Sequence, residues 1–122
     1  MKSDTYRMSM LYDFYGELLT EKQKELFDLY YNEDLSLSEI AEHAGITRQG
    51  VRDAIMRAEE VLRDTEDKLG LMRRYGSIEK QVAKIAEAAS YIARVNATVR
   101  NYEIAARVDQ ILGVTRELSQ SV

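Results

Sequence analysis

With 122 residues, 45% of them hydrophobic and 31% charged, the chain is expected to fold, as one compact domain or as a small domain with a helical extension. It has no cysteine, no apolar run of membrane-spanning length and no readable signal peptide, so we expect a cytoplasmic protein without disulfides or thiolate-bound metal. The net charge of −4 is uneven, at −6 over residues 1–47 but +1 over both 48–76 and 77–122, so any phosphate-driven affinity should be modest and come from residue 48 onward.

Helical spacing of apolar residues runs along the whole chain and strand patterns are weak, so the sequence predicts an all-α fold. The first helix is predicted over about residues 5–18. Its apolar stripe consists of Leu11, Phe14, Tyr15 and Leu18. Thr20 with Gln23 has the spacing of a capping box and opens a second helix, which ends in a polar turn at residues 32–34.

Two further helices follow that turn. Ser36 and Glu39 form a second predicted capping box, which opens a short helix over residues 37–44. Thr47 is the predicted cap of the next helix, which extends to about residue 69. The few residues between the two helices leave room only for a tight turn.

These two helices and their turn have the pattern of a helix-turn-helix, in residues 36–62. Ala41 supplies the small side chain that steeply crossing helices need, and Gly45 supplies the positive φ of the tight turn. The residues expected to close the core between both helices are Ile40, Ala44, Ile46, Val51 and Ile55. This agreement of small, glycine and apolar positions indicates a motif whose second helix enters the major groove of DNA.

Candidate contacts with double-stranded DNA lie on both helices. Those at the start of the second helix are Thr47, Arg48, Gln49, Arg52 and Asp53. Arg48 or Arg52 can bond bidentately to guanine, and Gln49 to adenine. Phosphate contacts are expected at Arg57 and Arg63, and at Ser36 and Ser38. The alternative is that the arginines are ordinary solvated helix residues with acidic neighbours.

After residue 76 the chain becomes rich in alanine, and we expect a C-terminal helical extension over residues 77–122, beside a helix-turn-helix domain over residues 1–76. Ser77 is the predicted N-cap of the new helix. A heptad seam follows, in steps of four and three residues, through Ile78, Val82, Ile85, Ala89, Ile92, Asn96 and Val99. A last amphipathic stretch over residues 104–112 is expected to end at Gly113.

A single helix cannot bury such a seam alone. It can fold back on the 104–112 stretch of its own chain, or it can pair with a second copy. We favour a homodimer, because helix-turn-helix proteins gain affinity by reading two half-sites. The predicted dimerisation residues are Ile78, Val82, Ile85, Ile92 and Asn96. Asn96 would set the register of a coiled coil, or else mark where one helix stops and the next begins.

Residues 37–62 resemble the fourth conserved region of sigma-70-type transcription initiation factors. The matching positions are Thr47, Arg48, Val51 and Arg52. Gln49 and Gly50 depart from that pattern, which usually carries Glu and Arg there. Promoter recognition of the sigma kind is therefore not expected.

A wider resemblance covers residues 6–75. Its motifs are Asp13-Phe14-Tyr15, Leu18-Leu19-Thr20 with Lys22-Gln23, and Ser36-Leu37-Ser38-Glu39-Ile40-Ala41. Together they resemble the YlxM-like family of bacterial DNA-binding proteins, whose genes lie beside those of the signal recognition particle GTPase. The resemblance implies a regulator or accessory factor of that targeting pathway, and our first hypothesis is a DNA-binding regulator. The alternative is an accessory factor that binds the RNA or the GTPase of the signal recognition particle and never reads DNA.

No enzyme, metal or cofactor is predicted. His43 is the only histidine, and we expect it at the surface, so a hydrolytic triad or a His/Cys metal site has too few members. An acidic run consists of Glu59, Glu60, Asp64 and Asp67. It is interleaved with Arg57, Arg63 and Lys68, which favours a solvated, charge-paired helix face over a cation site.

Overall fold

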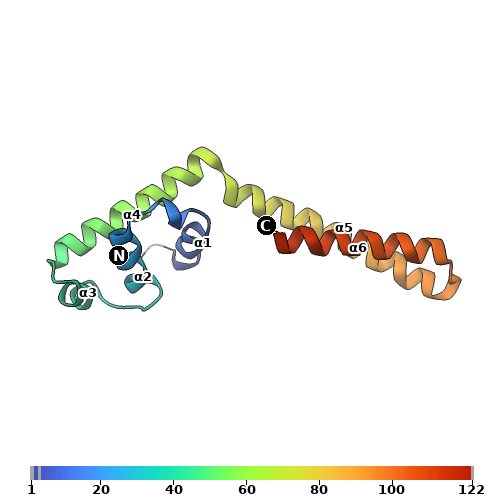
Figure 1. Cartoon of the computed structure of the whole chain (residues 1–122), viewed down its shortest axis with the longest axis horizontal. Helices are drawn as coiled ribbons and strands as arrows, with labels where there is room; N and C mark the ends of the chain where they lie inside the picture. Colours follow the sequence, from blue (N-terminus) through green and yellow to red (C-terminus); the bar gives the residue numbers. More distant parts are fainter. Residues whose placement is uncertain (1, 3, 122) are drawn as a thin grey trace. The chain divides into compact units, whose positions relative to one another are not determined.

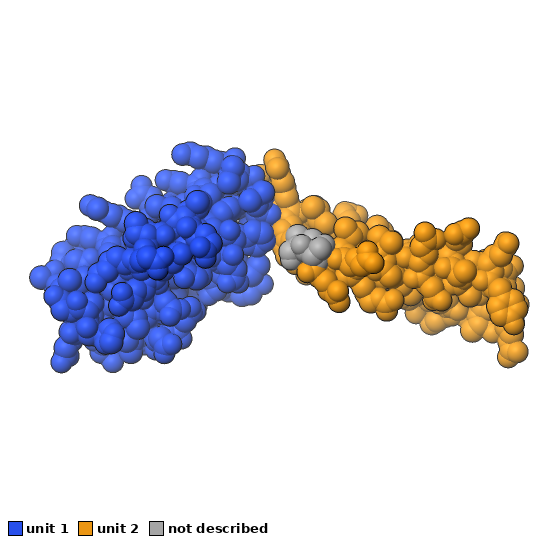
Figure 2. Space-filling model, viewed as in Figure 1, with its two compact units in different colours: residues 1–72 blue, residues 73–122 orange. Residues whose placement is uncertain are grey.

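The computed structural model describes residue 2 and residues 4–121, and over them it has six α-helices, one short 3-10 helix and no strand (Figure 1). The all-α prediction is therefore confirmed. The chain divides into two compact units, Met1–Met72 (unit 1) and Arg73–Val122 (unit 2), which Figure 2 colours separately. Unit 1 contains the helix-turn-helix, and unit 2 is a pair of long helices.

The helices of unit 1 are α1 (Thr5–Tyr15), η1 (Gly16–Leu18), α2 (Glu21–Tyr31), α3 (Leu37–Ala44) and α4 (Arg48–Leu69). The four predicted α-helices are present, but the first ends at Tyr15, three residues early. There the backbone leaves the helical region, with φ −124° and ψ 4°, and η1 follows. Tyr15 is buried and bonded to Glu66 of α4, so tertiary packing ends a helix that periodicity alone would continue. Leu18, predicted in the apolar stripe, is consequently exposed.

Side-chain caps define the starts of α2 and α3 as predicted. The hydroxyls of Thr20 and Ser36 each accept the backbone N–H three residues on, at 3.1 Å in both boxes. Gln23 and Glu39 complete the boxes by accepting the cap N–H groups, at 2.9 and 3.1 Å. The bond from the Ser36 N–H also lowers the pKa of the Glu39 carboxyl, because it favours the charged form.

The central helix of unit 1 is α4, which packs against α1, α2 and α3. Its fully buried apolar residues are Val51, Ile55, Ala58 and Leu62, and those facing them include Leu11, Leu26, Phe27 and Ile40. Ile46 was predicted in this core but is exposed, so that prediction is wrong. Ile46 lies in the turn between α3 and α4, where no helix periodicity directs a side chain inward.

Two glutamates share the inward face of α4. Glu59 is 4% exposed and accepts a hydrogen bond from the Tyr31 hydroxyl, whereas Glu66 is 5% exposed and accepts one from the Tyr15 hydroxyl at 2.5 Å. A polar group inside a protein must be paired in this way, because its desolvation is unfavourable. The predicted solvated acidic face is therefore wrong for Glu59, which instead ties α4 to α2.

Unit 2 consists of α5 (Leu71–Val99), which begins two residues before the boundary, and α6 (Tyr102–Ser121). The two run antiparallel side by side (Figure 1), with hollows lined by both. The predicted helix start at Ser77 is wrong, because α5 continues through Gly76 and Ser77. One glycine costs about 1 kcal/mol in a helix interior, too little to end a helix of 29 residues. The last helix likewise continues through Gly113.

Only three of the seven residues of the heptad seam are buried within the chain. The residues buried between α5 and α6 are Val82, Ala89 and Asn96 of α5, with Val108 and Thr115 of α6. Asn96 donates from Nδ2 to the Asn101 carbonyl at 2.9 Å, and Asn101 N–H donates to Oδ1 of Asn96 at 3.0 Å. Asn96 therefore holds the α5–α6 turn, which favours the second of the two interpretations of this residue.

Replacing Gly45 with alanine should lower the free energy of unfolding by about 1 kcal/mol, because φ is 70° there and side chains disfavour that region. An added Cβ meets nothing within 4 Å, so the loss would come from backbone strain alone. Gly76→Ala is the matched control, since Gly76 is helical and equally open. Gly76→Ala should raise the free energy of unfolding by up to about 1 kcal/mol. Urea unfolding of both variants and of the unmodified protein measures the two changes. Equal midpoints for Gly45→Ala and the unmodified protein would contradict the left-handed turn.

Candidate nucleic-acid interface

The segment from α3 to α4 has the geometry of a helix-turn-helix. Gly45 ends α3 in the left-handed conformation, and the N–H groups of Gly45 and Ile46 both bond to the Ala41 carbonyl, at 3.0 and 3.2 Å. Thr47 then begins α4, with its Oγ1 accepting the Gly50 N–H at 2.9 Å. The turn between the two helices is therefore held by hydrogen bonds on both sides, which presents the start of α4 in one orientation.

The residues predicted to contact DNA are all exposed on this motif: Ser36, Ser38, Thr47, Arg48, Gln49, Arg52, Asp53 and Arg57. Arg48 and Arg52 lie one turn apart on the same side of α4. Gln49 and Asp53 form a second pair one turn apart on α4, and Gln49 Nε2 donates to Oδ1 of Asp53 at 2.9 Å. Gln49 would have to release Asp53 before its amide could bond bidentately to adenine. The two arginines therefore remain the better candidates for reading bases.

The hydroxyls of Ser36 and Thr47 already have structural roles. Each oxygen accepts a backbone N–H as the N-cap of its helix, so only the hydroxyl hydrogen remains for a phosphate. The Ser38 hydroxyl, in the first turn of α3, has no hydrogen-bond partner among the described residues. Of the three, Ser38 is the most available for a phosphate contact.

Three arginines in the first half of α4 have exposed side chains. Arg48, Arg52 and Arg57 form no ion pair with any residue that the structure describes. Because Glu59 and Glu66 point inward, the exposed part of α4 carries five Lys and Arg against four Asp and Glu. This excess of one positive charge is confined to α4. Unit 1 holds nine Lys and Arg against sixteen Asp and Glu, a net charge of −7.

Sequence reasoning missed Glu59 and Glu66 as residues that position α4. Their spacing offered a signal, since Glu59 follows Ile55 by four residues and Glu66 follows Leu62 by four. Residues four apart lie on the same face of a helix. Two tyrosines elsewhere in the chain supply their hydroxyl donors, and no local pattern shows which tyrosines those are.

The described residues include no group of three or more His, Asp or Glu placed to hold a metal ion. His43 is exposed in the last turn of α3, as expected. No helix within the described part of the chain is long and apolar enough to cross a membrane. The site is therefore an exposed helix end at which the side chains of Arg48 and Arg52 face solvent.

Comparison with known proteins gives a match to a family model described as "Putative helix-turn-helix protein, YlxM / p13 like", over residues 2–102. A protein of Caldanaerobacter subterraneus subsp. tengcongensis is 51% identical over 87 residues, covering 71% of this chain and 74% of that protein. A protein of Thermoanaerobacter sp. strain X514 is 42% identical over 119 residues, covering 98% of this chain and 99% of that protein. The likeness thus extends beyond residues 6–75, where the resemblance was recognised, and includes unit 2.

Proposed function

The chain belongs to the family of YlxM / p13-like helix-turn-helix proteins, and on that premise we propose that it is a non-enzymatic DNA-binding regulatory protein of the cytoplasm. The observation that carries this proposal is the pair Arg48 and Arg52. Both are exposed in the first two turns of α4, and neither has an ion-pair partner among the described residues. In a helix-turn-helix this is the part of the second helix that contacts base edges.

In the proposed complex, the start of α4 lies in the major groove of double-stranded DNA. The guanidinium groups of Arg48 and Arg52 present paired donors that match O6 and N7 of guanine. Arg57, about two turns further along, and Ser38, at the start of α3, contact phosphates and set the register. The unpaired N–H groups at the start of α4 add a local positive potential that favours phosphate binding there.

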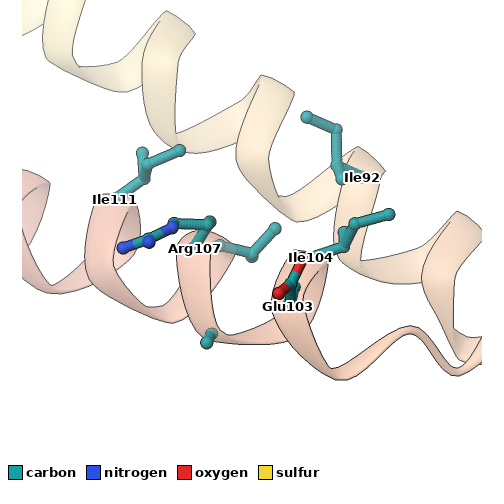
Figure 3. A pocket seen from close by; sticks show the side chains of 7 residues that line it. Ile92, Glu103, Ile104, Arg107 and Ile111 are labelled. Atoms are coloured by element: carbon teal, nitrogen blue, oxygen red, sulfur yellow. The ribbon is translucent and has the colours of Figure 1, made fainter.

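We also propose that the protein is a homodimer held together by unit 2. The hairpin leaves an apolar edge of residues that are each 39–50% exposed, namely Ile78, Ile85, Ile92, Ile104, Ile111 and Leu118. Figure 3 shows Ile92 of α5 facing a hollow of about 560 Å³ that Ile104 and Ile111 of α6 also line. Two helices cannot enclose a core, whereas two such hairpins can form a four-helix bundle. A dimer would then read two half-sites about 34–36 Å apart.

One observation favours a second candidate function, that of an accessory factor binding the RNA or the GTPase of the signal recognition particle. Unit 1, which contains the motif, carries a net charge of −7. Affinity for duplex DNA depends on neutralised phosphates, and an acidic surface around the motif opposes it. In this case the helix-turn-helix would serve as a scaffold for a specific RNA or protein.

Replacing Arg48 or Arg52 with alanine should weaken DNA binding by about 1–3 kcal/mol, because each loses a base contact. Unfolding midpoints should barely change, since both side chains are exposed. Lys68→Ala, in the last turn of α4, is the matched control and should bind almost normally. Fluorescence anisotropy would compare duplex fragments from the bacterial chromosome with the signal recognition particle RNA. Tight binding of the RNA alone would favour the second candidate, and no binding of either at low salt would overturn both nucleic-acid functions.

A further inference from the structure

The outward face of α5 carries a row of charged and aromatic residues that has no part in the fold. The opposite face packs on α6 through Val82 and Ala89. The outward residues, all exposed, are Lys80, Lys84, Glu87, Tyr91 and Arg94. Their spacing of three and four residues places them along one side of the helix. Lys80, Lys84, Tyr91 and Arg94 are called the basic stripe below.

The cations of the basic stripe are available to a ligand. Lys80, Lys84 and Arg94 form no ion pair with the residues for which the structure gives positions. Glu87 contributes a single opposing charge on this face. Unit 2 as a whole holds eight Lys and Arg against five Asp and Glu, a net charge of +3, in contrast to −7 for unit 1. Unit 2 is therefore the part of this acidic protein that carries a net positive charge.

Tyr91 gives the basic stripe a stacking surface. The residue is 61% exposed, and the Arg94 guanidinium lies over its ring at 5.6 Å from the ring centroid. A shallow hollow beside the ring is bordered by Lys84, Glu87 and Ile92. An exposed aromatic ring among cations is the arrangement on which unpaired bases stack while their phosphates are neutralised.

We propose that the basic stripe binds single-stranded nucleic acid, with phosphates along Lys80, Lys84 and Arg94 and one base stacked on Tyr91. At about 1.5 Å per residue, the distance from Lys80 to Arg94 is about 21 Å, enough for roughly six nucleotides of a stacked strand. Two other ligands fit the basic stripe less well. The bases of a duplex are stacked on one another and offer no free face to Tyr91. An acidic protein surface could pair with the cations but would leave the Tyr91 ring without a stacking partner. The site is separate from Arg48 and Arg52 and does not depend on DNA reading by α4.

The test uses the full chain with a fluorescein-labelled oligouridine of 20 nucleotides and a duplex DNA of 20 base pairs, at about 100 mM salt, where distant charges are screened. The stripe variant is Lys80→Gln/Lys84→Gln/Arg94→Gln. The control variant, Lys22→Gln/Lys68→Gln/Arg116→Gln, removes the same charge at exposed positions elsewhere. The stripe variant should bind oligouridine at least about tenfold more weakly. The slope of its log affinity against log salt concentration (the salt slope) should become shallower by about two. The control should lose less than about twofold.

Tyr91 provides an independent readout of stacking. Tyr91→Ala should weaken oligouridine binding about fivefold or more without changing the salt slope, and Tyr91→Phe should bind almost normally. Normal binding by the stripe variant, an equal loss in the control, or no binding of oligouridine by the unmodified protein would each overturn the inference. A loss confined to Arg48→Ala and Arg52→Ala would overturn it while supporting the proposed function. A loss in the stripe variant with duplex binding retained would support this site alone.

Discussion

Replacing Glu66 with alanine is expected to lower the free energy of unfolding by about 3 kcal/mol, more than the loss expected for Gly45→Ala. Glu66 is 5% exposed, and its carboxylate accepts bonds from the Tyr15 hydroxyl at 2.5 Å and from the Met72 N–H at 3.0 Å. Alanine would leave both donors unpaired and would open a cavity beside α1. Urea unfolding measures the loss. Glu60→Ala is the control, since Glu60 is exposed on the same helix and should change stability by less than about 0.5 kcal/mol.

Tyr15, the hydrogen-bond partner of Glu66, should make the free energy of unfolding depend on pH. Burial, followed by the hydrogen bond to Glu66, raises the pKa of Tyr15 above its ordinary value of 10.0. The unfolded chain would therefore release this proton near pH 10, while the folded chain keeps it. Stability from this pair is fully present below pH 10 and is lost as the pH rises through the raised pKa of the folded state. Tyr15→Phe should make unfolding less pH-dependent above pH 10 than in the unmodified protein.

The Tyr15–Glu66 pair also holds the connection from α4 to α5. The Tyr15 oxygen accepts the Leu71 N–H at 3.0 Å, just after Gly70 takes its left-handed φ of 64°. Tyr15→Phe should therefore destabilise by about 2 kcal/mol, because it removes an acceptor and leaves a buried carboxylate with fewer donors. A loss below about 0.5 kcal/mol for both Glu66→Ala and Tyr15→Phe would show that the pair does not stabilise unit 1.

The second large effect is expected at the apolar edge of unit 2. Ile85→Asp should weaken the proposed homodimer at least about 100-fold, because a carboxylate would be desolvated in an apolar interface and a twofold axis repeats the change. Ile111→Asp should act alike, since both isoleucines lie on the same edge and are 49% and 39% exposed in the single chain. Sedimentation equilibrium at micromolar concentration measures the change.

The matched control for the dimer is Ser77→Asp, which adds the same charge at an exposed position of α5 outside the apolar edge. It should leave the association unchanged. Loss of the dimer should also weaken duplex DNA binding at least about tenfold, because a monomer contacts one half-site. A monomeric unmodified protein, or equal association of all three variants, would show that the apolar edge does not join two copies.

Local chemistry made unit 1 largely predictable. The caps Thr20, Ser36 and Thr47 satisfy backbone N–H groups within three residues, so their effect can be read directly from the chain. Gly45 acts just as locally, through its own φ. Short-range interactions of this kind need no knowledge of the tertiary structure.

The same reasoning failed where local preferences were weak. Gly76 and Ser77 looked like a helix boundary, but neither residue opposes a continuous helix strongly enough to end it. The boundary is instead marked by Asn101, whose carbonyl accepts a bond from Asn96. The Asn101 side chain caps α6 by accepting the N–H groups of Glu103 and Ile104 at 2.9 and 3.1 Å. The true boundary lies where these two asparagines meet.

By itself, the sequence determined the all-helical class, the helix-turn-helix with its caps, and the heptad period of the C-terminal region. Only the tertiary structure decided which seam positions are buried, since Ala89 is 2% exposed and Ile92, three residues later on the same seam, is 44% exposed. It also decided that Glu59 and Glu66 lie inside, paired with tyrosines from α1 and α2. Periodicity specifies that a face will be buried, but the neighbouring helix specifies how much of it, because burial depends on contacts between residues far apart in the chain.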